Sequence, residues 1–161
     1  MKVNFKEEQK FGQWWLWLIL GALLLLPVYG LYKQVILEES FGTKPTSNLA
    51  LLFMFVVILL LFGLIWWMRL RTEIDQKGIR VTFSPLDRQN ILWIDVQSAK
   101  VIDYGFVGGW GIRLWTKYGT VYNTQGKIGL AIILKNGKKF LIGTQKELEL
   151  KNVIQQIDLL Q

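Results

Sequence analysis

The sequence contains no cysteine and no histidine among its 161 residues. A disulfide framework and a Cys- or His-liganded zinc site are therefore excluded, and so are a cysteine nucleophile and a histidine general base. Charged residues are also few, at 19%, whereas hydrophobic residues make up 52%. The carboxylates Asp87, Asp95 and Asp103 are spread over different predicted elements, without a nucleophile or metal-ligand set beside them. We therefore expect no catalytic, cofactor or metal site.

The hydrophobic excess is concentrated in two long apolar runs. Residues 11–32 carry no charge, with Trp14, Trp15 and Trp17 near one end and Tyr29 and Tyr32 near the other. Residues 49–68 form a second uncharged run that contains Trp66 and Trp67. Helices of this length span the hydrocarbon core of a bilayer, and Trp and Tyr collect at its interfaces. A signal peptide would be shorter and would end in small residues, so the first run is interpreted as an anchor.

The basic residues around these runs predict the orientation of the chain. Residues 1–10 contain Lys2, Lys6 and Lys10, and four Lys or Arg follow the second run between Arg69 and Arg80. The connecting loop, residues 33–48, carries only Lys33 and Lys44, which Glu38 and Glu39 offset. Because cytoplasmic flanks are enriched in Lys and Arg, both termini are expected in the cytoplasm and the loop outside.

Residues 69–161 have a different composition and are rich in charge, with 14 Lys and Arg against 8 Asp and Glu. Alternation of apolar and polar residues predicts β-strands in this part of the chain. Asn136-Gly137 is a strong hairpin signal, because both positions accept positive φ. The expected strands number seven and cover residues 70–75, 78–84, 99–104, 112–117, 119–124, 127–134 and 139–143.

The end of the chain predicts an amphipathic helix. Thr144 and Glu147 have the spacing of a capping box, and apolar residues then recur at helical spacing at positions 150, 153, 154, 157 and 160. The expected fold is therefore α+β: a two-helix transmembrane hairpin, then a seven-stranded β-barrel or sandwich whose open end the C-terminal helix closes.

Several stretches of the second half carry a resemblance to a known family. They are Thr82-Phe83-Ser84-Pro85-Leu86, residues 91–96 leading to Lys100-Val101, residues 108–113, and Leu141-Ile142-Gly143-Thr144-Gln145. With the order of elements, they resemble an uncharacterised bacterial family of two-span membrane proteins with a pleckstrin-homology-like (PH-like) domain. The resemblance implies this fold for residues 69–161, and it implies no particular activity.

Two groups of residues are candidate binding sites. Trp110, Arg113 and Trp115 lie in or shortly after a glycine-rich turn and are candidate contacts for a protein partner. For Trp110, packing within the turn is the favoured interpretation, and a contact point beside Arg113 is the alternative. Lys135, Lys138 and Lys139 flank the Asn136-Gly137 turn. A solvated hairpin tip is the favoured interpretation of the lysines, and contact with anionic lipid headgroups is the alternative.

The expected function is that of a non-enzymatic, membrane-anchored module that binds a protein, which could be a second copy of this chain. Two alternatives remain: binding of anionic headgroups or envelope sensing by the basic domain, and service as an accessory subunit of a membrane enzyme. No nucleic-acid-binding motif is present, so a nucleic-acid partner is not expected.

Overall fold

The computed structural model describes residues 3–42 and 46–158, and these form two compact units. The predictions that involve Lys2, Lys44 and Leu160 lie outside the described residues. Residues 13–67 make one unit, and residues 1–12 together with 68–161 make the other. The chain therefore leaves the second unit after its first strand, forms the helical unit, and returns.

The helical unit consists of α1 (Trp14–Val35) and α2 (Asn48–Trp67), which are long and apolar enough to span a membrane. Their contact includes edge-on packing of Trp17 against Phe62 and Trp66, with ring centroids 5.2 and 5.5 Å apart. Gly30 of α1 lies against the side chain of Leu51, where a larger residue would not fit without movement. Most other side chains of both helices are exposed, as expected for surfaces that face lipid rather than a protein core.

The first helix begins three residues later than the start of the uncharged run. Phe11 is not part of α1, because its ring packs edge-on against Phe83 of the second unit at 6.3 Å. Gly12 lies beside the amide of Gln125 in the same unit. Hydrophobicity alone cannot separate a residue that packs on a neighbouring domain from one that continues a membrane-spanning helix, which explains the difference.

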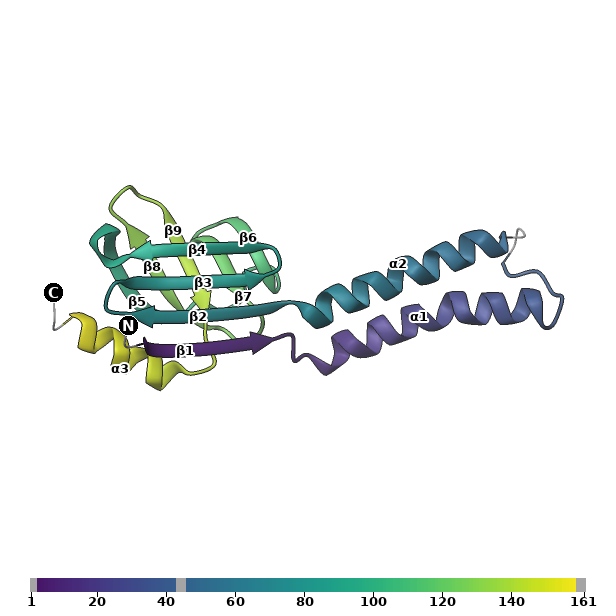
Figure 1. Ribbon diagram of the computed structural model, residues 1–161, viewed down its shortest axis with the longest axis horizontal. Helices are drawn as coiled ribbons and strands as arrows, with labels where there is room; N and C mark the ends of the chain where they lie inside the picture. Colours follow the sequence, from purple (N-terminus) through teal and green to yellow (C-terminus); the bar gives the residue numbers. More distant parts are fainter. Residues whose placement is uncertain (1–2, 43–45, 159–161) are drawn as a thin grey trace. The chain divides into compact units, whose positions relative to one another are not determined.

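The second unit contains two sheets (Figure 1). The four-stranded sheet has the order β1-β2-β3-β4 and is antiparallel throughout; its strands are β1 (Val3–Lys10), β2 (Arg69–Asp75), β3 (Gly78–Ser84) and β4 (Asp87–Leu92). The short 3₁₀ helix η1 (Trp93–Asp95) leads from β4 to the other sheet. Lys10 pairs with Arg69, so the strand before α1 and the strand after α2 are neighbours.

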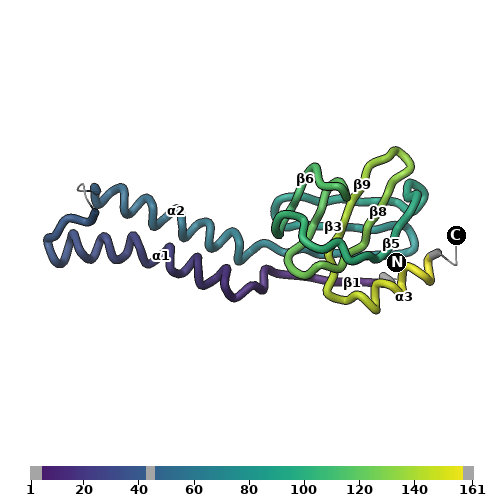
Figure 2. The backbone as a smooth tube through the Cα atoms, turned by 180° about the vertical axis from the view of Figure 1, so that it is seen from behind, coloured from purple at the N-terminus to yellow at the C-terminus, as the bar shows by residue number. Residues whose placement is uncertain are grey.

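The five-stranded sheet has the order β5-β8-β9-β7-β6. Its strands are β5 (Val96–Asp103), β6 (Gly111–Thr116), β7 (Gly119–Asn123), β8 (Ile128–Leu134) and β9 (Lys139–Gly143). The pairing of β7 with β9 is parallel, and the other pairings are antiparallel. Strands of the two sheets cross at a large angle, as Figures 1 and 2 show from opposite sides.

The hydrophobic core lies between the two sheets and is completed by α3 (Glu147–Asp158). Leu70 and Phe83 come from the first sheet, and Leu130 and Ile132 from the second; all four are fully buried. The stripe predicted on the last helix is confirmed over its described residues, since it contributes Leu150, Val153, Ile154 and Ile157 to this core. The barrel is not confirmed: the described strands form two open sheets, so the unit is a sandwich closed by a helix.

The predicted capping box at the start of α3 is wrong. The Thr144 hydroxyl accepts a hydrogen bond from the Lys146 amide at 3.0 Å. The backbone amide of Thr144 donates to the carbonyl of Ile128. The Glu147 carboxylate is paired with Lys151 at 2.6 Å instead of reaching back. The carbonyl of Ile128, in β8, thus satisfies the backbone donor that a capping glutamate would otherwise satisfy.

The seven predicted strands are present as β2, β3 and β5–β9, with ends shifted by up to three residues, and two further strands were not predicted. One is β4, which begins with Asp87, a residue type that is common in turns. The other is β1, in residues to which no secondary structure was assigned. Its inward side chains alternate, but two of them are polar: Phe5, Glu7 and Gln9 are all at least 95% buried.

Hydrogen bonds to residues at or after the ends of β7 and β9 satisfy the buried polar groups of β1. One Glu7 oxygen accepts from the Thr144 hydroxyl at 2.6 Å, and the other accepts from the Gln145 amide at 2.8 Å. The Gln9 side chain donates to the carbonyl of Gly143 at 2.8 Å and accepts from the Thr124 hydroxyl at 2.9 Å. Because buried polar groups are costly when unpaired, this network ties β1 to one place in the sandwich.

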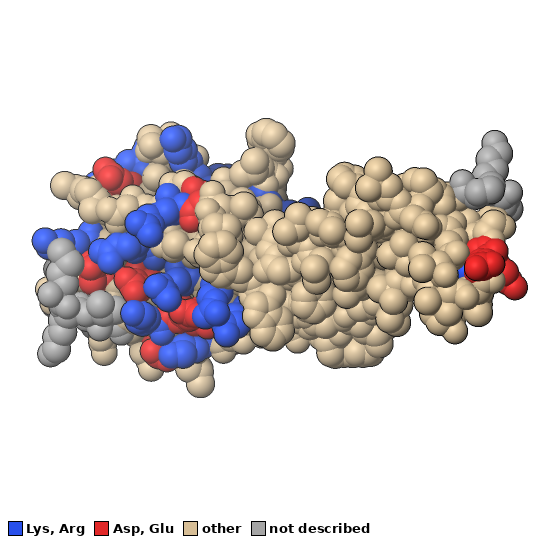
Figure 3. All heavy atoms as spheres, turned by 45° about the vertical axis from the view of Figure 1, so that its right-hand side comes forward, with Lys and Arg blue, Asp and Glu red and all other residues tan. Residues whose placement is uncertain are grey.

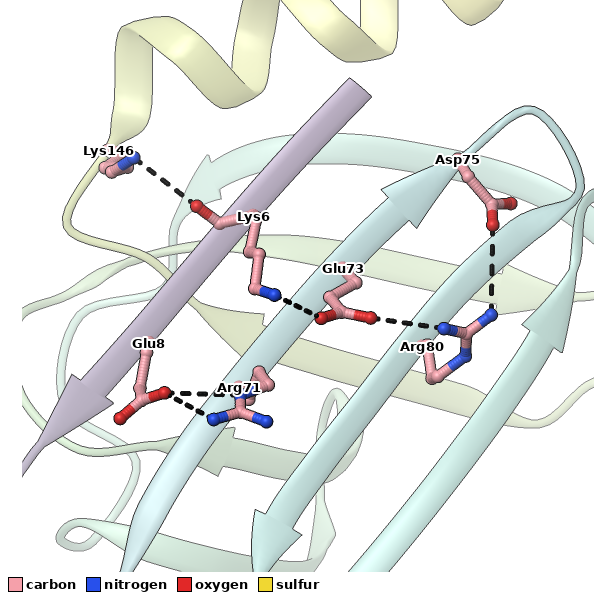
Figure 4. Close-up of polar contacts among 7 residues, drawn as sticks. All are labelled: Lys6, Glu8, Arg71, Glu73, Asp75, Arg80 and Lys146. Atoms are coloured by element: carbon pink, nitrogen blue, oxygen red, sulfur yellow. Dashed lines mark hydrogen bonds and ion pairs between the residues drawn. The ribbon is translucent and has the colours of Figure 1, made fainter. Parts of the chain in front are cut away.

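The outward face of the four-stranded sheet carries cross-strand ion pairs (Figure 4). Glu8 accepts from Arg69 at 2.8 Å and from Arg71 at 2.6 Å. Glu73 lies between Lys6 at 3.0 Å and Arg80 at 3.1 Å. Hydrogen bonds from Arg71 and Arg69 lower the pKa of Glu8 to about 2, so its carboxylate is ionised at neutral pH. Exposed pairs contribute little stability each, and here they favour the observed register of β1 on β2.

Candidate functional site

A groove of about 510 Å³ lies between the free edge of one sheet and the strands of the other. We call it the β4 groove, because β4 is the edge strand on this side of its sheet, and strands of the five-stranded sheet cross behind it (Figure 1). The residues that line it come from β4, from the β6–β7 hairpin and from the start of β9: Asp87, Gln89, Leu114, Trp115, Gly119, Thr120, Tyr122, Lys138, Lys139 and Phe140.

The polar part of the groove is built around Asp87. Its carboxylate accepts from the Tyr122 hydroxyl at 2.6 Å, from the Arg88 amide at 2.7 Å and from the Gln89 side chain at 3.2 Å. The hydrogen bond from Tyr122 is the main cause that lowers the pKa of Asp87. Burial, and then the hydrogen bond to Asp87, raise the pKa of Tyr122. Asp87 is therefore ionised and Tyr122 protonated at neutral pH, and the pair forms a fixed wall of the groove.

The apolar part of the groove is formed by Leu114 and Trp115. They are the extra residues of a β-bulge, because Arg113 pairs with Val121 and Thr116 pairs with Gly119. Trp115 has φ +55°, a left-handed conformation that costs a residue with a side chain about 1–2 kcal/mol. Its side chain is 95% exposed. Trp115 thus exposes a large ring to water from a backbone conformation that is costly to maintain. Such a residue is a candidate contact point for a ligand.

Two of the three predicted lysines lie in the groove, and the third lies outside it. The Asn136-Gly137 hairpin is present: Gly137 has φ +82°, and the Asn136 side chain accepts from the Lys138 amide at 3.0 Å. Lys138 and Lys139 line the groove. Neither amine has a carboxylate within ion-pair distance in residues 3–42 and 46–158. Lys135 is exposed, and its backbone amide donates to the carbonyl of Asp95.

Of the three residues predicted around the glycine-rich turn, only Trp115 lines the groove. Trp110 is half-buried, and its ring packs edge-on against Phe106 at 6.3 Å. The guanidinium of Arg113 lies directly over Gly109, which has φ +132° and could not carry a side chain there. The structure thus brings Trp115 together with Lys138 and Lys139, and it places Trp110 and Arg113 in the packing of the turn.

The groove brings together residues that are far apart in the sequence. Trp115 and Lys139 become neighbours because Gly119, the first residue of β7, lies against the backbone of Lys139. The parallel pairing of β7 with β9 produces this contact. Asp87 and Gln89 belong to the strand that sequence patterns did not indicate, so the far wall of the groove could not have been found from local signals.

Comparisons with known proteins give no relatives: no protein-family model matches this chain, and no curated protein matches it. The site is therefore interpreted from its own geometry.

Proposed function

We propose that this chain is a non-enzymatic module with a PH-like domain that α1 and α2 anchor at the cytoplasmic face of a bacterial inner membrane. In this proposal the β4 groove binds an extended segment of a partner protein. The main support for the proposal is that one groove combines three features. They are the exposed Trp115 with its positive φ, the two lysine side chains and the free edge of β4.

Each part of the groove fits one property of such a segment. The free edge of β4 offers backbone groups that an added strand can pair with. Leu114 and Trp115 offer apolar area at the mouth, and Lys138 and Lys139 offer positive charge. The Asp87 carboxylate is already engaged by Tyr122 and Gln89. We therefore infer an occupant that combines an apolar side chain with a nearby acidic one.

The orientation in the membrane has support from the pairing of β1 with β2. If both helices span the bilayer, these paired strands place the ends of the two helices on the same side. The flanks at that end contain Lys6, Lys10, Arg69 and Arg71, which favours the cytoplasmic side.

Removal of the Trp115 side chain is expected to abolish partner binding while the domain stays folded. In full-length protein purified from gently solubilised membranes, Trp115→Gly should weaken capture of the co-purifying protein about 30-fold or more, as expected for an interface residue worth 2 kcal/mol or more. Glycine also relieves the left-handed φ, so the melting temperature should be unchanged or higher.

The matched control is Leu148→Ala, which removes a side chain that is 77% exposed on α3, outside the groove. This variant should keep the partner. Partner capture that survives in Trp115→Gly would contradict the proposal.

If the groove instead binds anionic headgroups, the wild type will bind phosphatidylglycerol vesicles in a salt-sensitive way, and replacing Lys135, Lys138 and Lys139 by Ser will abolish that binding.

A further inference from the structure

Two exposed apolar side chains lie at the end of the sandwich from which the chain runs into α1 and α2. Leu86 is 57% exposed in the turn between β3 and β4, and Phe106 is 77% exposed in the loop between β5 and β6. Neither lines the β4 groove. Their position relative to Gly12 and Met68, where the chain leaves the sandwich unit and returns to it, follows from the strand register and from side-chain contacts within that unit.

The position of Leu86 follows from the register of the four-stranded sheet. The last row of paired residues, at the end of β1 that leads to α1, consists of Lys10, Arg69 and Ser84. The turn that carries Leu86 begins directly after Ser84, and the Leu86 amide donates to the carbonyl of Phe83 at 2.7 Å. Leu86 is therefore at the edge of the sandwich where both connections to the helices leave it.

A chain of contacts within the same unit places Phe106 at this end as well. Gly12, the last residue of the unit before α1, lies beside Gln125. The backbone carbonyl of the neighbouring Gly126 accepts a hydrogen bond from the hydroxyl of Tyr104. Tyr104 is the first residue of the loop that carries Phe106. Leu86 and Phe106 are thus on two different loops around the exit points of the chain.

The connections to the helices are too short to let this end of the sandwich move away from a bilayer. Arg69 is two residues from the last residue of α2, and Lys10 is four residues from the first residue of α1. Even fully extended chain covers only about 7 and 14 Å over these distances. The helix ends carry Trp14, Trp66 and Trp67, which are exposed and of the residue type that marks a membrane interface.

We propose that this end of the sandwich rests on the bilayer that α1 and α2 span, with Leu86 and Phe106 in the boundary between headgroups and acyl chains. The occupant of the surface is lipid because the short connections keep it at the depth of the headgroups, which occupy about 5–8 Å on each side of the hydrocarbon core. The nearby outward cations Lys10 and Arg88 fit the anionic headgroups of a cytoplasmic leaflet.

The test uses the natural absence of cysteine, since any introduced cysteine is the sole labelling site. Leu86→Cys and Phe106→Cys are made in the full chain, spin-labelled, and reconstituted in vesicles of phosphatidylethanolamine and phosphatidylglycerol. Ile94→Cys is the matched control: Ile94 is 73% exposed and lies in η1, where the Trp93 amide donates to the Lys77 carbonyl at the opposite end of the sheet.

The ratio of label collisions with oxygen, which is lipid-soluble, to collisions with a water-soluble nickel chelate reports the depth of each label. We expect this ratio to be several-fold higher at positions 86 and 106 than at position 94. A ratio at either position equal to that at 94 would show that the loop is in water and would overturn the proposal. Protection of both labels from both reagents would also overturn it, because that pattern indicates contact with protein.

Discussion

Deletion of residues 1–9 is expected to unfold the sandwich, although these residues precede α1 and lie some 60 positions before β2 in the sequence. The deletion removes Phe5, which is 2% exposed in the core, and uncovers the edge of β2. It also removes the hydrogen bonds that Gln9 and Glu7 make with the hydroxyls of Thr124 and Thr144. The loss of a buried phenylalanine costs about 3–5 kcal/mol, and each lost hydrogen bond adds about 0.5–1.5 kcal/mol. Together these approach the whole stability of an ordinary domain.

A graded form of this experiment is Phe5→Ala in the full chain. It should lower the free energy of unfolding by about 3–5 kcal/mol, measured by denaturant titration of the protein in detergent micelles with near-ultraviolet circular dichroism. The neighbouring Lys6→Ala is the control, because Lys6 points outward to an exposed ion pair with Glu73 and should cost about 1 kcal/mol or less. Equal, small losses for both variants would mean that β1 is not part of the sandwich.

The second large effect is expected in α3. Ile154 and Ile157 are about 95% buried in the core that both sheets share. Each change to alanine should cost about 2–5 kcal/mol, so the double variant should be largely unfolded at 25 °C. Leu148→Ala on the same helix removes an exposed side chain and should change stability by less than about 0.5 kcal/mol.

Thermal melts of the full chain measure this difference. A fragment that begins at Thr72 would be unsuitable, since it lacks β1 and the first residues of β2. A melting temperature of the double variant close to that of the wild type would show that α3 is peripheral to the core.

Local sequence patterns were sufficient where one physical effect determines the structure. The uncharged runs predicted both long helices, and alternation predicted β3 and β9 with their observed bounds. The Asn136-Gly137 hairpin followed from its need for positive φ. In each case neighbouring residues carry the whole signal.

Patterns failed where distant residues determine the structure. The inward positions of β1 include Glu7 and Gln9, which are buried only because Thr124, Thr144 and Gly143 supply hydrogen bonds. β4 begins with Asp87, a residue typical of turns, which is instead satisfied by Tyr122 from the other sheet. No local signal can indicate partners more than 30 residues away.

The same limit applied to the candidate site. Trp115 and the lysines at 138 and 139 were identified as separate candidates, one for protein and one for lipid. The pairing of β7 with β9 unites them in one groove, and the unexpected strand β4 supplies its other side. Trp110 and Arg113 have sequence surroundings as suggestive as those of Trp115, yet they pack within their own turn.

The central claim is that α1 and α2 cross the membrane and hold the sandwich on its cytoplasmic side. Topology reporters test it most directly: an enzyme active only outside the inner membrane is fused after Gly42 in one strain and after Gln161 in another. Because β1 and β2 are paired and the chain around them is basic, we expect activity at Gly42 and none at Gln161. Activity at Gln161 with none at Gly42 would reverse the orientation, and inactivity at both positions would show that the helices do not cross.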